Sequence, residues 1–600
     1  MKTDVTNIQE LWSALKTNGD KYKGIWDDIS KVTGITVQPD YTWKASADET
    51  ANKQVDEFVD DPTSALSVNQ AGDYLIGIMW GTGDKVVDVI PSRYVLELAE
   101  TAEVSPWFSF ISNQLLYHMN HADAGFHTAL KPYAYDQSAF GNSGIGVFPN
   151  KDFTNRTADN ALLFRGYGID NTRIDEGKSG TVEIVFTTYH WKVNRIIGDM
   201  CMTDGVMDNE KYDKIPRAIK QAYESGDYNK EFNIVCGIFP RTDFDPKLKG
   251  KRGARYRGVW FLDDGNEAAS VPFYEEDFGE KPISWARAIK VRGEVYGRSS
   301  GTMLLSTIKA GNFIVGTVIE ILEKMSNPAL GMFNNAIFGD SVLDSSPNGL
   351  TIFNNALAGN SQSPMFPLYD VGNPEGIIKF LIPYLNEKIV TAFKVDALLD
   401  FSSAKEMTAT ESLQRYVIRG KSLSGMLQQQ KIECLEPVTK RSLSLLLALN
   451  ELGVDPADPR AKALGERGKQ ERIIPSAVLE TMRSGRPWFE LKFNNELEKL
   501  TRTQAVQNLL QVLQTIIAVA GVYPDIIEAV NWYKLIRDIN DNLDYNNGIL
   551  MPEKEFKAKI AAIAQQRQMA MMVEAGKAGS EIQVNQATAN KTNKEAVSAK

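Results

Sequence analysis

Two long helical patterns on either side of a charge-poor segment constrain this chain more than any other feature. Apolar side chains recur at helical spacing over residues 299–325, which corresponds to a helix of about 40 Å. A second pattern, over residues 373–399, opens with Asn-Pro-Glu, the order of a cap, a first-position proline and a first-turn acid. The sequence therefore predicts two long, rigid helices joined by an excursion over residues 326–371.

The excursion between the two helices is unusual in its charge. Residues 326–371 contain three aspartates, Asp340, Asp344 and Asp370, and neither lysine nor arginine. An Asn-Gly pair at 348–349 is typical of a hairpin turn before a strand. So few charges indicate that the excursion packs against another surface, and other copies of the same chain are one candidate.

The remaining patterns define the fold class. Between residues 160 and 296, four stretches rich in β-branched and aromatic residues predict strands, and one short helix interrupts them. The strand-like stretches cover residues 161–169, 181–191, 232–240 and 256–262, and the helix covers 216–224. Helical patterns cover 65–80, 106–133, 408–452, 499–521, 525–538 and 552–577, with a further strand at 488–493. We therefore expect an α+β protein.

Length, charge and cysteine content exclude several classes. A chain of 600 residues exceeds one compact core, so we expect several domains or distinct regions. Its net charge of −10 argues against tight, non-specific phosphate binding, although a duplex could still pass through without being held. The cysteines Cys201, Cys236 and Cys434 lie too far apart for a disulfide framework or a cysteine-rich zinc site. Neither a signal segment nor an apolar run of about 20 residues is present, so we expect a soluble protein of a reducing compartment without a membrane partner.

The motifs of common enzyme classes are missing or misplaced. The sequence has no Walker-type phosphate loop, and the glycines of 81–85 have the wrong spacing for one. The glycines of 141–146 follow a helix and precede a strand, the reverse of a dinucleotide site. His118 and His121 could share a helix face and ligate a metal with His127 nearby, but a solvated or capping role is favoured. We therefore expect no catalytic residues, no metal and no cofactor.

Two charged features have alternative interpretations. The carboxylates of 263–264 and 275–277 could act as acid and base, but their turn-like setting favours solvated loops. A basic cluster could be a nucleic-acid patch or a charged hairpin tip, and in an acidic chain the hairpin tip is favoured. The cluster comprises Arg241, Lys247, Lys249, Lys251, Arg252, Arg255 and Arg257.

Short sequence segments and their order carry a family resemblance. The most specific is Glu294-Val295-Tyr296-Gly297-Arg298, just before the first long helix. Others lie at 126–130, 140–144, 189–199, 215–223, 281–287, 366–372 and 407–411. In this order they resemble the portal, or head-to-tail connector, proteins of short-tailed bacteriophages. The resemblance covers roughly residues 60 to 450, and the C-terminal helices match by order only.

The resemblance implies a portal fold with a wing, a long-helix stem, a small clip hairpin and a C-terminal helical crown. Twelve subunits would form a homo-oligomeric ring at one capsid vertex, in a virion assembled in the host cytoplasm. The implied regions are 1–298 (wing), 299–325 (first stem helix), 326–371 (clip), 372–398 (second stem helix), 399–407 (tunnel loop), 408–487 (long helix and return through the wing), 488–577 (crown) and 578–600 (disordered tail).

The family's function implies partners and candidate site residues. The ring would pass double-stranded DNA during packaging and ejection, contact the major capsid protein, and dock the packaging terminase and later the tail adaptor at the clip. Lys405, Ser402, Ser403 and Lys394 are candidates for facing DNA, although each lysine could equally be solvated or paired between subunits. Asp340, Asp344 and Asn348 are candidates for docking partners at the clip.

Two other functions remain as alternatives. One is another virion structural protein, such as an internal core or tail-tube component. The other is a carboxylate-based hydrolase built on the α+β block, for which the sequence offers no preferred acid pair.

Overall fold

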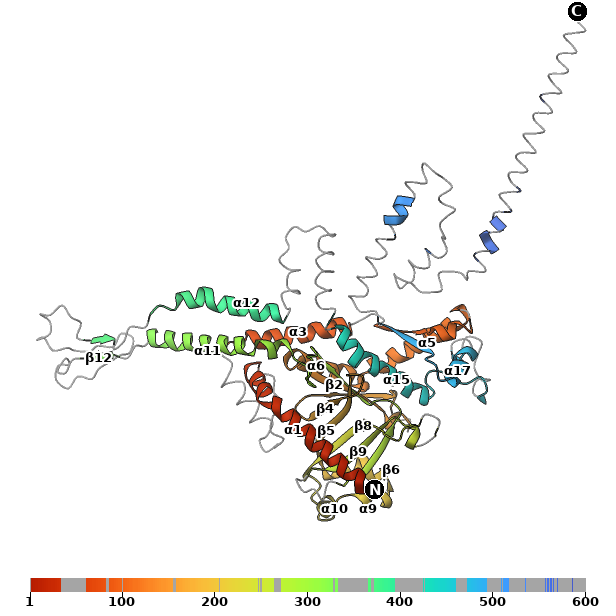
Figure 1. The fold of residues 1–600 in the computed structure, drawn as a ribbon, viewed down its shortest axis with the longest axis horizontal. Coiled ribbons are helices and arrows are strands. Elements are labelled where there is room, and N and C mark those ends of the chain that lie inside the picture. The colour runs from red at the N-terminus through yellow and green to blue at the C-terminus, as the bar shows by residue number, and fades with distance from the viewer. Residues whose placement is uncertain are drawn as a thin grey trace, which may run out of the picture. The chain divides into compact units, whose positions relative to one another are not determined.

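A computed structural model describes two compact units of this chain (Figure 1). The described residues are 2–33, 61–81, 86–99, 101–154, 158–203, 206–245, 248, 251–263, 271–326, 330–332, 365–367, 372–393, 425, 427–459 and 472–493, with short stretches and single residues beyond 508. The first unit comprises Met1–Val86 and Asn113–Gly453, and the second comprises Val87–Ser112 and Val454–Lys600.

Two antiparallel sheets form the centre of the first unit. One has five strands in the order β10-β9-β8-β5-β4, and the other has three strands in the order β11-β2-β3. The strands are β2 (Asn142–Pro149), β3 (Leu162–Tyr167), β4 (Thr172–Glu176), β5 (Val182–Lys192), β8 (Glu231–Pro240), β9 (Tyr256–Leu262), β10 (Tyr274–Phe278) and β11 (Ile283–Arg287). All four strands predicted between residues 160 and 296 are confirmed, and so is the α+β class.

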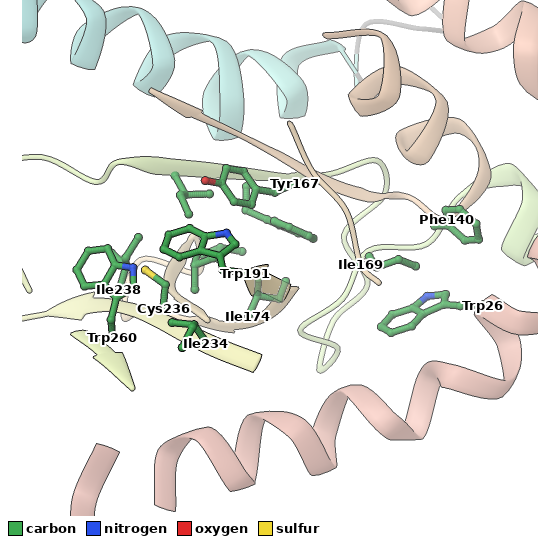
Figure 2. Packing of buried hydrophobic residues seen from close by; sticks show 14 of the residues in the cluster. Trp26, Phe140, Tyr167, Ile169, Ile174, Trp191, Ile234, Cys236, Ile238 and Trp260 are labelled. Carbon is green, nitrogen blue, oxygen red and sulfur yellow. The ribbon is translucent and has the colours of Figure 1, made fainter. Parts of the chain in front are cut away.

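Aromatic and aliphatic side chains together fill the core of this unit (Figure 2). Helix α1 (Lys2–Thr33) brings Trp26 into it, where the indole ring packs 5.0 Å from the ring of Tyr296. Trp191 at the end of β5 and Trp260 on β9 are also buried. Because a buried aromatic ring removes a large apolar area from water, these contacts supply much of the driving force for folding the unit.

Further helices complete the first unit. They are α3 (Thr63–Met79), α6 (Phe126–Ala139), α8 (Val193–Cys201), α9 (Asn209–Lys214) and α10 (Arg217–Glu224). The sequence predicted α3 and α10, but neither α8 nor α9. A short hairpin of β6 (Met202–Thr203) and β7 (Val206–Met207) joins α8 to α9.

The single helix predicted over 106–133 is wrong. The structure has α5 (Thr101–Asn120), a 3₁₀ turn η1 (Ala122–Ala124) and α6 in its place. His121 accepts a hydrogen bond from the backbone N–H of Asp123, and Gly125 adopts a left-handed φ of 70°. A capping side chain followed by a left-handed glycine ends one helix and starts another, even though the apolar spacing continues.

The two long helices form an antiparallel hairpin (Figure 1). Helix α11 (Ser300–Ser326) agrees within one residue with the prediction. The second consists of a π-helical turn η4 (Ile377–Leu381) and α12 (Ile382–Ala392), so it ends earlier than predicted. This π turn ends two residues before Pro383, whose nitrogen has no N–H for the regular helical bond. At the far end, β12 (Leu330–Met332) pairs with β13 (Met365–Pro367).

The third predicted long helix is described from residue 427 onward. It contains a π-helical turn η5 (Lys431–Leu435), continues as α15 (Glu436–Ala448), and ends four residues before the predicted boundary.

The second unit pairs distant parts of the chain. Strand β1 (Val87–Pro91) is antiparallel to β14 (Phe489–Phe493), the strand predicted at 488–493. Helices α4 (Arg93–Leu96) and α17 (Ser476–Arg483) pack together beside it. Trp107 contacts Trp488 with ring centroids 5.6 Å apart. Residues 511–516 are helical, as predicted, and the predicted tail at 578–600 lies outside the described residues apart from Asn585.

Candidate assembly site at the helical hairpin

The hairpin begins at a serine that caps α11. The hydroxyl oxygen of Ser299 accepts a hydrogen bond from the backbone N–H of Thr302 at 3.0 Å and donates one to the carbonyl of Ala139 on α6. The hydroxyl of Ser300 donates to the carbonyl of Ala392 at 2.8 Å, which ties the start of α11 to the end of α12. Both helices are therefore fixed at the base of the hairpin.

Two of the family-like segments meet directly below this cap. The side chain of Asn142 donates to the carbonyl of Gly297 at 2.8 Å and accepts from its N–H at 2.7 Å. A Cβ atom on Gly297 would lie 2.6 Å from the carbonyl oxygen of Gly141 and 2.7 Å from Cβ of Arg287. Only glycine permits this approach, which explains why the Tyr-Gly-Arg segment carries a glycine here.

The other members of the 294–298 segment also hold the base of α11. The ring of Tyr296 is buried between Tyr22 and Trp26 on α1. Burial raises the pKa of the Tyr296 hydroxyl to about 12. Arg298 forms an ion pair with Glu294 at the surface. The segment therefore works as an anchor between the sheets, α1 and the hairpin.

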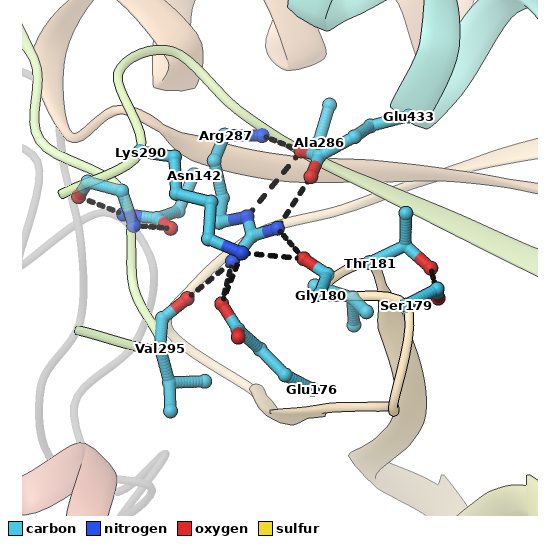
Figure 3. A network of polar contacts seen from close by, with 12 residues as sticks. Asn142, Glu176, Ser179, Gly180, Thr181, Ala286, Arg287, Lys290, Val295 and Glu433 are labelled. Carbon is cyan, nitrogen blue, oxygen red and sulfur yellow. Dashed lines mark hydrogen bonds and ion pairs between the residues drawn. The ribbon is translucent and has the colours of Figure 1, made fainter. Parts of the chain in front are cut away.

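A buried arginine connects this anchor to the helix that follows the hairpin (Figure 3). Arg287 at the end of β11 has a fully buried side chain and forms ion pairs with Glu433 and Glu176. Its guanidinium also donates to the carbonyls of Val295 at 3.2 Å and Gly180 at 2.8 Å. Burial opposes the charged form, but hydrogen bonds and attraction from Glu433 and Glu176 outweigh it and raise the pKa of Arg287.

The π-helical turn η5 carries the glutamate that pairs with Arg287. Glu433 lies in η5, and its carboxylate also accepts from the backbone N–H of Arg287 at 2.9 Å. The preceding residue on the same helix face, Gln430, donates to Gln137 at 3.1 Å and to the carbonyl of Arg287 at 3.2 Å. Tyr133 donates to Gln430. A π turn inserts one extra residue into a helix, and here it turns Glu433, Cys434 and Leu435 inward together.

A partly buried lysine lies near the same network. Lys281 donates to the carbonyl of Val182 at 2.6 Å. Burial lowers the pKa of Lys281 to about 8, against the attraction of Glu433. Burial likewise raises the pKa of the nearby Cys434 thiol to about 12. The Cys434 thiol is not an activated nucleophile in this setting, because burial holds it in its neutral form.

The hairpin exposes several large apolar side chains. On α11 the buried residues Ile308, Gly311 and Val318 face the rest of the unit. Met303 and Phe313 lie on the other side and are 53% and 74% exposed. On the second helix, Phe380 is 76% exposed. The outer end of the hairpin adds further exposed apolar side chains, namely Ile319, Leu322, Met325, Ile378, Leu381 and Tyr384. We call the exposed apolar residues of α11, η4 and α12 the hairpin surface.

The exposed apolar side chains of the hairpin are more than a single isolated case. Singly exposed apolar residues are ordinary, but several of them on two packed helices indicate a contact surface. By length and composition alone, α11 could also cross a membrane, with a mean hydropathy of 1.4 over 18 residues. The sequence criterion of an unbroken apolar run missed this, because Ser, Thr, Lys and Asn interrupt the pattern.

The residues predicted to face DNA or dock partners are not among those that the structure describes. Lys394, Ser402, Ser403 and Lys405 lie in the gap between 393 and 425. Asp340, Asp344 and Asn348 lie in the gap between 332 and 365. Their roles remain predictions.

The histidine and basic clusters have structural partners. His118 is buried and contacts Asn160, and His121 caps η1. Within the described ranges, no three His, Cys, Asp or Glu side chains gather as metal ligands. In the basic cluster, Arg241 pairs with Asp277 and Asp243, Arg252 with Asp243, Arg255 with Glu183, and Arg257 with Glu275. Lys247 and Lys249 lie outside the described residues, and the ion pairs of the four arginines agree with the charged hairpin interpretation.

Sequence reasoning missed the roles of Arg287, Glu433 and the hairpin surface. Arg287 was visible only as the last residue of a family-like segment, and nothing in the pattern around Glu433 indicated burial. A signal for the hairpin surface did exist. Apolar residues occur all round the 299–325 helix, which is typical of a helix covered on more than one side.

The described part of the chain is an α+β block that anchors a hairpin of two long helices. Residues 5–550 match the model of the family described as "Bacteriophage head to tail connecting protein". The chain belongs to this family, which is structural and whose members are virion components. The predicted resemblance is thereby confirmed.

Individual proteins also match the chain. The chain is 21% identical over 475 residues to the "Probable portal protein" of Bordetella phage BPP-1, covering 78% of this chain and 75% of the relative. Among solved structures, it resembles a chain of "Virion of native gene transfer agent (GTA) particle" at 11% identity, with a TM-score of 0.30 and coverage of 75% and 85% of the two chains. A chain of "Neck of empty GTA particle computed with C6 symmetry" has 12% identity, a TM-score of 0.28 and coverage of 71% and 91%. Because both TM-scores are low, the family assignment rests on the sequence matches.

Proposed function

We propose that this connector protein assembles through its hairpin surface into a closed ring of about twelve copies at one capsid vertex. The observation that carries this proposal is the exposure of Phe313 and Phe380 on opposite helices of one hairpin. A cyclic ring needs two different contact surfaces on each subunit, so that one face of each copy meets another face of the next. The α11 face and the η4–α12 face supply such a pair.

The energetics of covering the hairpin surface support a second copy as its occupant. Burying one large apolar side chain is worth roughly 1.5–3 kcal/mol. Several such residues per copy, on two faces, therefore offset a substantial part of the cost of association. The anchor at Ser299, Gly297 and Arg287 holds the hairpin in place, so little conformational freedom is lost when neighbouring hairpins pack.

The ring would be the channel for double-stranded DNA during packaging and ejection. A channel must let DNA slide, and each strong contact with a phosphate would raise the affinity for DNA and hold it in place. A chain with a net charge of −10 is consistent with this role. In this scheme Lys394, Ser402, Ser403 and Lys405 face DNA. The clip at 326–371, with Asp340, Asp344 and Asn348, docks the packaging terminase and later the tail adaptor. The block 1–298 borders the major capsid protein.

Two substitutions on the hairpin surface test the assembly. Phe313→Ser and Phe380→Ser each remove a large exposed ring, and Val206→Ser, at a site 70% exposed on β7, is the matched control. Mass photometry and negative-stain electron microscopy at equal concentration measure the oligomer. We expect rings for the parent chain and the control, and at least tenfold weaker assembly for both phenylalanine variants, because each loses more than about 1.4 kcal/mol per contact.

The other outcomes separate the parts of the proposal. Rings that persist unchanged in both variants would leave the ring intact but reject the hairpin surface as its interface. A parent chain that stays monomeric and floats with liposomes would reject the ring in favour of membrane insertion of α11. DNA passage is tested separately, by measuring how much DNA is packaged in virions assembled with Lys405→Ala. The same measurement is made with Lys394→Ala.

A further inference from the structure

His118 is a buried histidine with one ring nitrogen that lacks a hydrogen-bond partner. Its side chain on α5 is 2% exposed. Nδ1 accepts from the backbone N–H of Ala161 at 3.3 Å and lies 3.3 Å from Oδ1 of Asn160. Nε2 is buried without a hydrogen bond and lies 4.0 Å from a carboxylate oxygen of Glu451. That separation is too long for a hydrogen bond but short enough for one to form with a small shift.

The position of Glu451 is set by the end of α15. Asn450 adopts a left-handed φ of 63°, and the N–H of Glu451 donates to the carbonyl of Leu446 at 2.9 Å. This is the pattern of a Schellman-type helix end, in which a left-handed residue reverses the chain. The next residue, Leu452, is fully buried. Glu451 is therefore held beside His118, while its own side chain remains 36% exposed and open to protons from solvent.

The hydrogen bonds around the ring define which tautomer is present. Because Ala161 N–H donates to Nδ1, that nitrogen carries no proton, and the proton of the neutral ring is on Nε2, facing Glu451. In the protonated ring both nitrogens donate. Nδ1–H would then point to Oδ1 of Asn160, and the Ala161 N–H would lose its acceptor.

We propose that His118 and Glu451 form an acid-sensitive latch, in which protonation moves the imidazole from Ala161 to Asn160 and Glu451. Burial lowers the pKa of His118, a hydrogen bond to Asn160 raises it, and His121 lowers it, with a net decrease. The latch therefore responds at pH values below 6.5, the ordinary pKa of a histidine side chain. At neutral pH the backbone at Ala161, just before β3, is held. In acid it is released, and Glu451 is drawn toward the ring.

The other charged groups around His118 lie elsewhere than against its Nε2 atom. His121 on the same turn lies 3.7 Å from Asp123. Helix α7 (Lys151–Thr154) places the ring of Phe153 5.9 Å from the imidazole and carries Lys151 and Asp152. Glu451 is the carboxylate that the structure places against Nε2.

The latch lies within one chain and does not depend on ring assembly. In sequence, His118 and Glu451 stand a few residues from Asn113 and Gly453, the two positions at which this unit's chain passes to the second unit. A pH-dependent contact here would act on both connecting segments at once. The proposal adds an acid response to the connector function.

Histidine hydrogen–deuterium exchange mass spectrometry on the full chain tests the latch, because it reports the pKa of each histidine. Glu451→Gln removes the carboxylate at a partly exposed site, and Asp123→Asn is the matched control beside His121. We expect the His118 midpoint below 6.5, lowered further by at least half a unit in Glu451→Gln and unchanged within error in Asp123→Asn. A His118 midpoint that is the same in the parent and Glu451→Gln would overturn the latch.

Backbone exchange at Ala161 supplies the second readout. After correction for the intrinsic rate, we expect the peptide containing Ala161 to lose at least threefold protection below the His118 midpoint. His118→Gln should make that protection independent of pH. Protection at Ala161 that stays constant through the His118 titration would reject the proposal, whether or not His118→Gln folds, because the parent chain alone provides this result.

Discussion

Arg287 on β11 and Glu433 in the π-helical turn η5 form an ion pair in which both side chains are almost fully buried. The pair joins a sheet strand to a helix 146 residues later in the chain. The same arginine contacts the segment that anchors α11, so one side chain links the sheet, the hairpin base and the helix after the hairpin. Buried pairs of this kind contribute little net stability when complete but are costly to break.

Removing one partner should therefore destabilise the protein strongly. We expect Glu433→Ala to lower the free energy of unfolding by about 3–5 kcal/mol, because it leaves the Arg287 charge buried with Glu176 alone. The control is Glu294→Ala, which removes an exposed pair with Arg298 and should cost at most about 1 kcal/mol. Urea denaturation monitors both, and equal losses would show that burial does not govern the Arg287 pair.

The close approach at Gly297 leads to a second prediction. Gly297→Ala would place Cβ 2.6 Å from a backbone carbonyl oxygen, and overpacking of this kind costs about 1–3 kcal/mol. Gly198→Ala on α8 is the matched control, since a Cβ there meets nothing within 4 Å. Alanine in an open helical position should instead stabilise by about 0.5–1 kcal/mol. Thermal melts of both variants should therefore shift in opposite directions, and a shift of the same sign would contradict the packing at Gly297.

Much of the fold could be predicted from local patterns. The four strands and α11 follow from β-branched runs and helical spacing, which depend on short stretches of sequence. The break at Gly125 was missed, because the apolar spacing continues across a glycine whose left-handed backbone is set by its surroundings. The pairing of β1 with β14 was also missed, since a contact across about 400 residues leaves no local signal.

The candidate site was harder to predict than the fold. The segments that contain Gly297 and Arg287 were found by resemblance, but their meeting point depends on tertiary packing. Glu433 lies in a π turn, and no spacing rule for regular helices places it inward. The hairpin surface could have been found from the all-round apolar pattern of α11, because such a helix needs neighbours on several sides.

Lys281 predicts a dependence of stability on pH. Its pKa is about 8 when folded and 10.5 when unfolded, so between these values the unfolded chain binds one more proton than the folded chain. The free energy of unfolding therefore rises with pH in this window through Lys281. In Lys281→Met this rise should be missing, so the parent chain gains relative to the variant from pH 8 to 10. Lys178→Met, at an exposed site, controls for the loss of any lysine. If the urea midpoints of all three proteins changed with pH in the same way, the lowered pKa of Lys281 would be contradicted.

The cap at the base of the hairpin gives the last prediction. Ser299→Ala removes the oxygen that accepts from Thr302 and the donor to Ala139, so we expect a loss of about 1–2 kcal/mol. Ser306→Ala on the exposed side of the same helix should change stability by less than about 0.5 kcal/mol, because alanine is at least as good a helix former. Because the cap fixes where α11 starts, Ser299→Ala should also increase backbone hydrogen exchange in residues 300–304 without affecting 314–318. If Ser299→Ala changed hydrogen exchange equally along the whole of α11, packing against α12, and not the cap, would hold the base of the hairpin.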